Sequence, residues 1–385
     1  MPPKSQTSSS ASSILPQSYS LKSSTELCSL WSNYGSISRL AVTQNTDADT
    51  KSTTTTLILK SILPPPSTSP DDESHLRKLI SYSVERYFYT HLAPHLSPLV
   101  FTKVATPISI NPSTGQLLLE DLTPSYPTSA YGSLASAPTT AVLKWLAGFH
   151  ATFWSPLSNN SGDNINTNTN INIGTPIPPP LSVSSPTTTN GIWQQGGYWY
   201  LSTRSEEHSA LLDSNEYAYL LPWISHVDSS IRKEKPQWKT LIHGDVKAAN
   251  ILFNHTSSSI NDRDNDVKAA LYDFQYCGIS TPAVDLVYFL STTVDRRSLT
   301  NLEGLLREYF DELCDVYAKA HGGDKLDDGL GYTFDVLKKQ WDVALVDWMR
   351  FMAGWGCWGN WRWVESSVKD IIKRWEKEGK EPVSE

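Results

Sequence analysis

In the first third of the chain, short apolar runs alternate with polar stretches, a pattern that is typical of strands joined by loops. Residues 37–42 and 55–63 are rich in β-branched and aliphatic side chains and predict two strands. The polar residues between them predict a hairpin loop. Two further strands are expected at 99–109 and 115–122, where aliphatic residues gather again.

Between these two pairs of strands, the apolar residues change to helical spacing. Residues 71–92 begin with acidic side chains and place Leu76, Ile80 and Val84 on one face, which predicts an amphipathic helix. Helical spacing then dominates from residue 139 onward. One predicted apolar face in the C-terminal third consists of Trp341, Leu345, Trp348 and Met352.

The pattern divides the chain into two lobes and two polar segments, and it predicts an α+β fold. Residues 25–123 predict a small β-rich lobe, and residues 124–385 predict a larger helical lobe. Residues 1–24 are Ser-rich and predict a disordered tail. Residues 157–190 are rich in Asn, Thr, Ser and Pro, and they predict a low-complexity insert that forms a mobile loop.

Composition narrows the classes of function. The chain has 385 residues and a net charge of −8, so a nucleic acid, which is itself strongly anionic, is a poor candidate as a partner. Four cysteines without a Cys-x-x-Cys pair argue against a zinc site and favour a reducing compartment. The N-terminus lacks an apolar signal segment, and charged residues interrupt the hydrophobic stretch 344–363. We therefore expect a cytoplasmic protein without a membrane span.

The stretch LIHGDVKAANILF, residues 241–253, carries the candidate chemistry. Short apolar runs surround Asp245 and Asn250, and a later apolar run ends at Asp273. Two short strands of this kind can form a hairpin that holds an amide oxygen and a carboxylate side by side. Asn250 and Asp273 would then suit Mg²⁺, and Asp245 could accept the proton of a hydroxyl group that attacks a phosphoryl group.

The sequence His243-Gly244-Asp245, followed by Asn250 and by Asp273-Phe274, resembles the protein-kinase-like fold. It is more similar to the aminoglycoside phosphotransferase and choline kinase superfamily, and closest to its choline-kinase-like or ecdysteroid-kinase-like branch. The stretches LLLEDL, WLAGFHATFW, GGYWYL and DFQYCGISTPAVDLVYFL also fit that branch. The resemblance implies a bilobal fold, ATP and Mg²⁺ as cofactors, and a small hydroxylated molecule as the acceptor of the γ-phosphoryl group.

The resemblance also implies roles for residues on the nucleotide side. Lys60 looks like the lysine that binds the α and β phosphates, and Glu85 looks like its ion-pair partner. Glu120 to Leu122 looks like the hinge whose backbone bonds the adenine edge. The stretch 33–38 takes the place of the loop that covers the phosphates, although Gly35 is its only glycine.

Four other residues receive roles near the reacting groups. Lys247 looks like the lysine that touches the transferred phosphate, which makes it a catalytic candidate beside the aspartate two residues earlier. Asp285 looks like the aspartate that tethers the catalytic loop, and it could also cap the helix that follows. His243 is interpreted as structural rather than as a base, and His150 as a core histidine.

The tryptophans allow two interpretations. The chain has 14 of them, and five lie in the stretch WMRFMAGWGCWGNWRW near the C-terminus. They could form an aromatic cage for a cationic acceptor, with Asp347 as the counter-charge. They could instead pack in the core, and this interpretation is favoured for most of them.

Two functions of different class remain. The first is an ATP-dependent kinase of a small hydroxylated metabolite, such as a choline-like compound, a sterol, a sugar or an aminoglycoside-like molecule. The alternative is a non-catalytic pseudokinase that binds a nucleotide or a partner. Lys60, Asp245, Asn250 and Asp273 are all present, which favours the kinase, whereas the glycine-poor phosphate loop favours the alternative. The sequence identifies neither the acceptor nor the oligomeric state.

Overall fold

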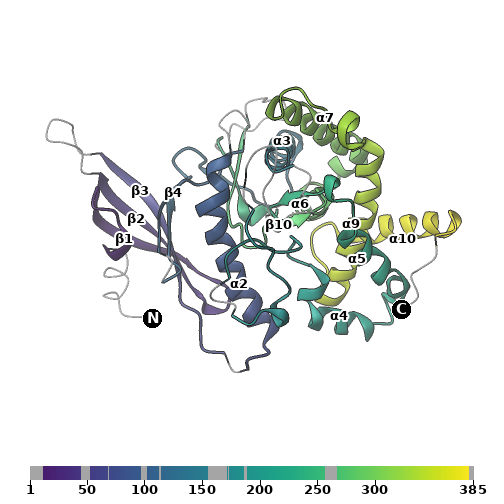
Figure 1. Ribbon diagram of the computed structural model, residues 1–385, viewed down its shortest axis with the longest axis horizontal. Coiled ribbons are helices and arrows are strands. Elements are labelled where there is room, and N and C mark those ends of the chain that lie inside the picture. Colours follow the sequence, from purple (N-terminus) through teal and green to yellow (C-terminus); the bar gives the residue numbers. More distant parts are fainter. Residues whose placement is uncertain are drawn as a thin grey trace.

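The computed structural model describes residues 12–44, 53–67, 69–96, 102–111, 114–154, 171, 173–185, 189–255 and 267–380. A small lobe built on an antiparallel sheet lies beside a larger helical lobe, with helix α2 (Glu73–Tyr87) between the sheet and the larger lobe (Figure 1). This arrangement confirms the predicted α+β bilobal fold.

The sheet of the small lobe has five strands in the order β1-β2-β3-β5-β4, and every neighbouring pair is antiparallel. The strands are β1 (Tyr19–Ser29), β2 (Gly35–Gln44), β3 (Thr54–Ile62), β4 (Pro107–Ile110) and β5 (Leu117–Glu120). The runs predicted at 37–42, 55–63 and 115–122 therefore coincide with strands. The run predicted at 99–109 contains only the start of β4, and residues 97–101 lie outside the described residues.

The predicted disordered tail is wrong in its last part, because β1 begins at Tyr19 and pairs with β2 along its whole length. Most side chains of β1 are exposed, since β1 is the edge strand of the sheet. An edge strand obtains its stability from backbone hydrogen bonds, so its sequence needs no apolar alternation. The Ser- and Thr-rich sequence of β1 therefore resembles that of a disordered tail. Residues 1–11 lie outside the described residues.

The predicted mobile insert also needs correction at its C-terminal end. Ile171, Ile173 and Ile177 are buried, and the backbone of Ile177 exchanges hydrogen bonds with residues 192 and 194. The short 3₁₀ helix Pro180–Ser182 packs against α2. Three isoleucines therefore anchor this part of the insert, whereas residues 155–170 lie outside the described residues.

The larger lobe contains eight α-helices within the described ranges, and α9 contacts five of the others. They are α3 (Ser136–Thr152), α4 (Ser205–Leu212), α5 (Ile224–Arg232), α6 (Ala283–Thr293), α7 (Leu302–Ala320), α8 (Leu326–Leu330), α9 (Phe334–Trp355) and α10 (Trp361–Lys377). The apolar face predicted on α9 is confirmed, because Trp341, Leu345, Trp348 and Met352 are all buried. None of the described helices combines the length and the hydrophobicity that crossing a bilayer requires.

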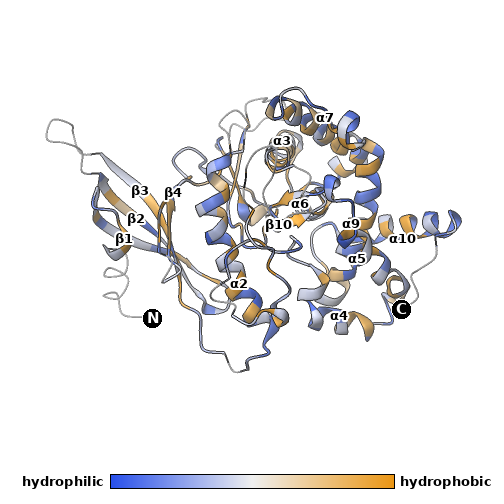
Figure 2. Ribbon diagram, viewed as in Figure 1, coloured by the Kyte–Doolittle hydropathy of each residue, from blue (hydrophilic) through white to orange (hydrophobic). Residues whose placement is uncertain are grey.

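Two groups of short strands lie where the helical lobe meets the small lobe. One group pairs β7 (Thr240–Ile242) with β10 (Gly278–Ser280). The other joins β6 (Thr128–Ser129), β8 (Ile251–Phe253) and β9 (Ala269–Leu271). In Figure 2, the outer helix α10 alternates between hydrophobic and hydrophilic turns.

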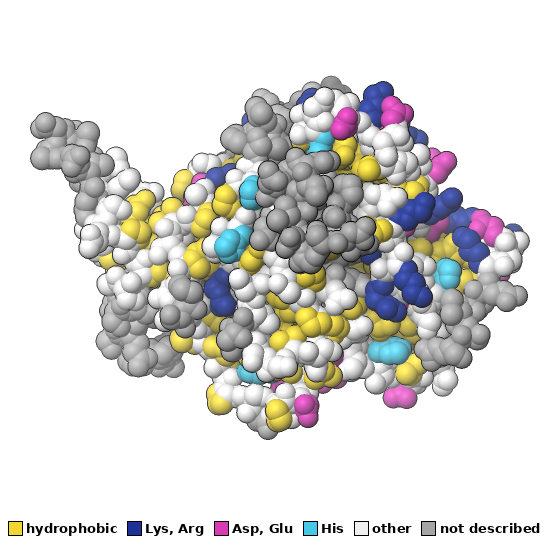
Figure 3. All heavy atoms as spheres, in the orientation of Figure 1, with side chains coloured by type: hydrophobic (Ala, Val, Ile, Leu, Met, Phe, Trp, Pro, Cys, Tyr) yellow, Lys and Arg dark blue, Asp and Glu magenta, His cyan; other side chains and the backbone are white. Residues whose placement is uncertain are grey.

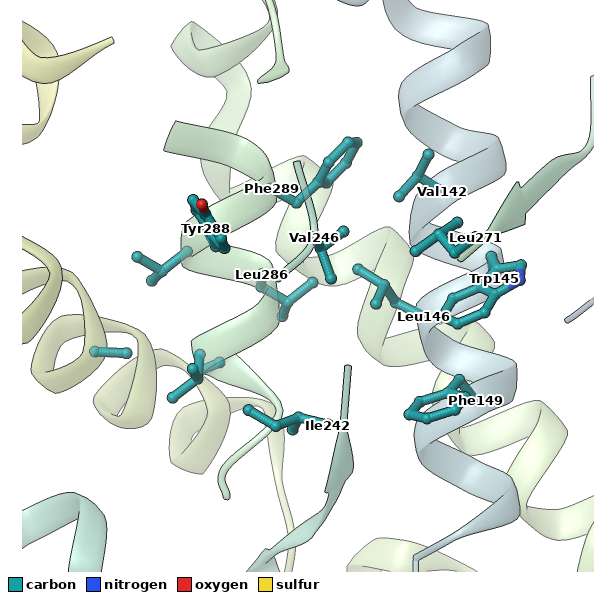
Figure 4. Packing of buried hydrophobic residues seen from close by; sticks show 14 of the residues in the cluster. Val142, Trp145, Leu146, Phe149, Ile242, Val246, Leu271, Leu286, Tyr288 and Phe289 are labelled. Atoms are coloured by element: carbon teal, nitrogen blue, oxygen red, sulfur yellow. The ribbon is translucent and has the colours of Figure 1, made fainter. Parts of the chain in front are cut away.

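The main core lies between α3, α6 and these short strands (Figure 4). Labelled members are Val142, Trp145, Leu146, Phe149, Ile242, Val246, Leu271, Leu286, Tyr288 and Phe289. Phe274 joins this core to the small lobe: its ring stacks on Phe88, just beyond α2, at 3.6 Å between ring centroids. On the face seen in Figure 3, basic side chains gather near the C-terminal helices, so the net charge of −8 is not spread evenly.

We expect Phe274→Ala to lower the free energy of unfolding by about 3–5 kcal/mol, because it opens a cavity where the two lobes meet. Urea denaturation followed by circular dichroism measures this change. Trp31→Ala is the matched control, since Trp31 is 85% exposed, and its effect should stay within about 0.5 kcal/mol. A loss below about 1 kcal/mol for Phe274→Ala would mean that the stacked ring does not join the lobes.

Candidate active site

The polar loop between β7 and β8 is held by one buried carboxylate, that of Asp285 on the first turn of α6. The backbone N–H groups of His243 and Gly244 each donate to it at 2.8 Å. His150 Nε2 lies 3.1 Å from the same carboxylate, and His150 Nδ1 lies 2.7 Å from the hydroxyl of Tyr309. Asp285 therefore occupies the tethering position that the sequence assigned to it, and His150 is buried as expected.

The backbone conformation and the close surroundings of Gly244 require a glycine between the histidine and the aspartate of the motif. Its φ is +80°, and a Cβ atom there would lie 2.2 Å from the carbonyl oxygen of Tyr276. Tyr198 donates its backbone N–H to the carbonyl of Gly244 at 2.8 Å. Gly196 and Gly278 are packed in a similar way, because an added Cβ atom at either position would collide with backbone atoms of the other. The backbone at Tyr276 and Gly197 therefore approaches the loop between β7 and β8 too closely for any side chain at position 244.

His243 supports the loop through both of its ring nitrogens. Its Nδ1 accepts the backbone N–H of Asp245 at 3.2 Å, so Nε2 carries the proton and donates to the carbonyl of Tyr272 at 3.1 Å. Burial lowers the pKa of His243, which keeps the ring neutral. A ring occupied in this way holds the backbone and is not placed to act as a base, in agreement with the structural interpretation.

Asp245 is buried, and its two carboxylate oxygens differ in their surroundings. Oδ2 accepts from Lys247 Nζ at 2.9 Å and from Asn250 Nδ2 at 3.0 Å. Oδ1 is buried, and no hydrogen bond of ordinary geometry reaches it from the described residues, although the hydroxyl of Tyr288 lies close enough to interact with this carboxylate. A buried carboxylate oxygen without a donor is costly unless a ligand supplies one. Burial and the nearby Asp245 also raise the pKa of Tyr288 well above its ordinary value.

Lys60 of β3, the predicted phosphate-binding lysine, bridges two carboxylates. Its Nζ lies 2.6 Å from Glu85 Oε2 and 2.9 Å from Asp273 Oδ1. Burial alone would lower the pKa of Lys60, but Asp273 and Glu85 together raise it above its ordinary value. Glu73, another glutamate of α2, bonds the backbone and hydroxyl of Ser205 instead. The structure therefore brings Lys60 together with Glu85, as the sequence predicted.

Helix α2 is fixed to the larger lobe by its first turns. Besides the contact of Glu73 with Ser205, Arg77 donates to the carbonyl of Thr203 at 2.5 Å. Ser205, which donates to Glu73, is the first residue of α4, and Thr203, which accepts from Arg77, lies just before it. The position of Glu85 is thus set by contacts with the larger lobe as well as by its own ion pair.

Asp273 follows β9 in a strained backbone conformation, with φ of +70°. Burial opposes ionisation of its side chain, but the charges of Lys60 and Lys247 outweigh it and lower the pKa of Asp273. The side chain is therefore an anion. Asn250 uses its amide nitrogen on Asp245, which leaves its amide oxygen as an acceptor.

These two residues fit Mg²⁺ as a hard cation that arrives with a nucleotide. Asp273 supplies an ionised carboxylate and Asn250 an amide oxygen, and Mg²⁺ commonly uses one or two such ligands together with substrate phosphates. Within the described residues, no group of three or more His, Cys, Asp or Glu side chains could hold a metal ion by itself. The donor set thus suits a metal bound with its substrate rather than a permanent metal centre.

The predicted phosphate-covering stretch, 33–38, is only partly a loop. The turn runs from Leu30 to Tyr34, and Gly35 already begins β2 opposite Ile62 of β3. A Cβ atom at Gly35 would lie 1.9 Å from the carbonyl oxygen of Ser61. The glycine is therefore required by strand packing, and a role for it in nucleotide binding stays a prediction.

The predicted hinge, Glu120 to Leu122, connects β5 to the larger lobe. The carboxylate of Glu120 accepts from Lys103 Nζ at 2.6 Å, and its backbone N–H donates to Thr106. The carbonyl of Leu122 accepts the N–H groups of residues 125 and 126. Their backbone contacts with adenine stay a prediction.

Asp347 is not a free counter-charge, which corrects the cage interpretation. It is buried and lies 2.7 Å from Arg350 Nε, and Arg350 also donates to the carbonyl of Trp199. Trp348 is fully buried in the core, as the packing interpretation expects, whereas Trp355 is half exposed.

Sequence reasoning gave no role to Tyr198 and Arg204, which the structure places next to the loop between β7 and β8. Lys247 Nζ lies 5.6 Å from the ring centroid of Tyr198, and the guanidinium of Arg204 lies 4.1 Å from the same ring. The stretch GGYWYL offered one signal, because two glycines before an aromatic residue indicate a close backbone approach.

Comparisons with known proteins identify the family of the chain. The sequence profile of the ecdysteroid kinase-like family matches residues 32–157 and 203–322. No curated protein matches the chain. A choline kinase structure from Cryptosporidium parvum is similar with a TM-score of 0.46 and 10% identity, over 96% of this chain and 94% of that chain. An ethanolamine kinase from Plasmodium vivax has a TM-score of 0.43 and 10% identity, over 92% of this chain and 82% of that chain.

Structural similarity at these TM-scores adds no argument about chemistry, whereas the family match covers well over half of the chain. It confirms the predicted superfamily and, of the choline-kinase-like and ecdysteroid-kinase-like branches that the sequence left open, it supports the second. The chain therefore belongs to the ecdysteroid kinase-like family.

Proposed function

We propose that this protein is an ATP-dependent kinase that transfers the γ-phosphoryl group to a hydroxyl group of a small molecule. The observation that carries the proposal is the Asp245 carboxylate: Lys247 and Asn250 hold Oδ2, whereas the buried Oδ1 lacks a well-placed hydrogen-bond donor among the described residues. An acceptor hydroxyl would supply that donor. Lys60 and Asp273, which suit nucleotide phosphates and their metal, lie in the same site.

In this reaction, the acceptor oxygen forms a bond to the γ-phosphorus while the bond from that phosphorus to the bridging oxygen of ADP breaks. The hydroxyl proton passes to Asp245 Oδ1. Lys247 and Asn250 hold the other oxygen of Asp245 and so fix the direction in which the carboxylate points. Lys60, oriented by Glu85, binds the nucleotide phosphates.

When bound with the nucleotide, Mg²⁺ would be held by Asn250 and Asp273 and would neutralise charge on the phosphates. The chain contributes mainly position and charge, because phosphoryl transfer has a loose transition state that needs little covalent help. The pseudokinase alternative is not favoured, since Lys60 pairs with Asp273, Asn250 bonds Asp245, and the charge of Lys247 acts on both aspartates.

We expect Asp245→Asn to reduce turnover by about 10²- to 10⁴-fold, because an amide cannot accept the hydroxyl proton. ATP affinity should change little, since Asp245 faces the acceptor. The measurement is ADP release with Mg-ATP across a panel of hydroxylated metabolites, with isothermal titration for ATP binding. Asp370→Asn, at an exposed position of α10, is the control and should behave like the natural protein. Full activity of Asp245→Asn with the authentic acceptor would exclude this aspartate as the base.

We expect Asp273→Asn to weaken binding of Mg-ATP by about tenfold or more, because a neutral amide is a poorer ligand for a hard cation than a carboxylate. Titration of ATP with Mg²⁺ and then with EDTA separates the metal contribution from direct contacts with the nucleotide. The difference between the two conditions should shrink in this variant. An unchanged effect of Mg²⁺ would contradict the metal-binding role.

A further inference from the structure

Three aromatic rings form a cage beside the catalytic loop. Tyr198 precedes α4, and Phe351 and Trp355 lie on the last turns of α9. The ring centroids are 5.6 Å apart for Tyr198 and Phe351, 5.8 Å for Phe351 and Trp355, and 6.3 Å for Tyr198 and Trp355. Trp355 is half exposed, so one side of the aromatic cage faces solvent.

The aromatic cage is already occupied by a cation of the chain itself. The guanidinium carbon of Arg204 lies 4.1 Å from the ring centroid of Tyr198, 5.3 Å from Phe351 and 5.8 Å from Trp355. These distances are within the range of cation–π attraction. Arg204 is 1% exposed, and it also donates to the carbonyl of Tyr198 at 2.8 Å.

The aromatic cage is close to the reacting carboxylate. Tyr198 bonds the backbone of Gly244, which directly precedes Asp245. Lys247, whose ammonium contacts Asp245, lies over the Tyr198 ring. Tyr198 also stacks with Tyr288 at 6.4 Å between centroids, and the Asp245 charge acts on Tyr288. A molecule that presents its hydroxyl to Asp245 would therefore meet the Tyr198 side of the cage.

The charges around the aromatic cage favour acceptors that are not cations. Arg77 lies near Arg204, and Glu207 is the carboxylate that acts on both guanidinium groups. Two positive charges thus face one negative charge. Asp347, which could have balanced a cationic acceptor, is paired with Arg350. A second cation would find its aromatic site filled and would be repelled by the excess positive charge.

We propose that Arg204 is a specificity-determining residue that fills the aromatic cage and excludes cationic acceptors, so that the acceptor is a hydroxylated molecule without a positive charge. This inference rests on the proposed kinase function and adds the substrate class. It reverses the interpretation in which these aromatic residues bind a cationic substrate.

Choline and 3,3-dimethylbutan-1-ol test the inference, because they have nearly the same shape and differ in charge. The natural protein should phosphorylate the neutral alcohol with a kcat/KM about tenfold or more above that of choline. Arg204→Met should shift the ratio of the two kcat/KM values toward choline by about tenfold or more, and Arg204→Lys should keep the natural ratio. A residue with only a structural role would lower both values and leave their ratio unchanged. Preference of the natural protein for choline would overturn the inference.

Binding of tetramethylammonium tests the same aromatic cage without turnover. Isothermal titration should show no saturable binding to the natural protein and saturable binding to Arg204→Met. Arg204→Gln, which keeps a hydrogen bond to the carbonyl of Tyr198, serves if Arg204→Met does not fold. Binding to the natural protein, or no binding to any folded Arg204 variant, would overturn the inference. Absence of phosphorylation of every alcohol tried would instead count against the proposed function, while this titration still decides the role of Arg204.

Discussion

The site depends on one buried carboxylate, that of Asp285. Such a group is costly to bury as an anion unless its oxygens are hydrogen-bonded, and it therefore demands donors. The backbone N–H groups of His243 and Gly244 supply two of them, and His150 lies against the same carboxylate. These hydrogen bonds fix the direction of the backbone immediately before Asp245. The positions of Asp245, Lys247 and Asn250 follow from it, since all three are within seven residues of His243 in a short loop between two strands.

The two sides of the site differ in charge. Beside β3, the carboxylates of Glu85 and Asp273 contact the ammonium group of Lys60, and Asp245 contacts that of Lys247. Burial raises the pKa of Glu85 to about 7, whereas the pKa of Asp273 is lowered, so Asp273 is the ionised carboxylate that suits a divalent cation. Around Tyr198, Arg77 and Arg204 outnumber Glu207. Tyr198 lies at the boundary, with Lys247 and Arg204 both over its ring.

The cluster of Lys60, Glu85 and Asp273 could be predicted from the sequence. The family resemblance requires a lysine, a glutamate and an aspartate in this order along the chain, and few other residues meet that requirement. Glu85 and Glu73 are separated by 12 positions, which places them about 120° apart around a helix. Helical phase alone could not say which of them faces Lys60. The answer depends on how α2 packs, and the structure directs Glu73 to Ser205.

Other features depend on contacts between distant parts of the chain and could not be predicted from local sequence patterns. Arg204 and Phe351 are 147 positions apart, and no pattern in the sequence around either residue indicates that their side chains are in contact. Strand β1 was hidden because a solvent-exposed edge strand needs backbone partners rather than apolar side chains. The three isoleucines in the insert were obscured by the polar residues around them.

Close backbone packing around three glycines limits which residues this site can accept. Gly196, Gly244 and Gly278 each lie where an added methyl group would strike backbone. A side chain at any of these positions would push apart the loop that carries Gly244, strand β10 and residues 196–198, and so would displace Asp245, the next residue along the chain. The side chain of Tyr198 is not subject to this constraint, although its backbone takes part in the same packing.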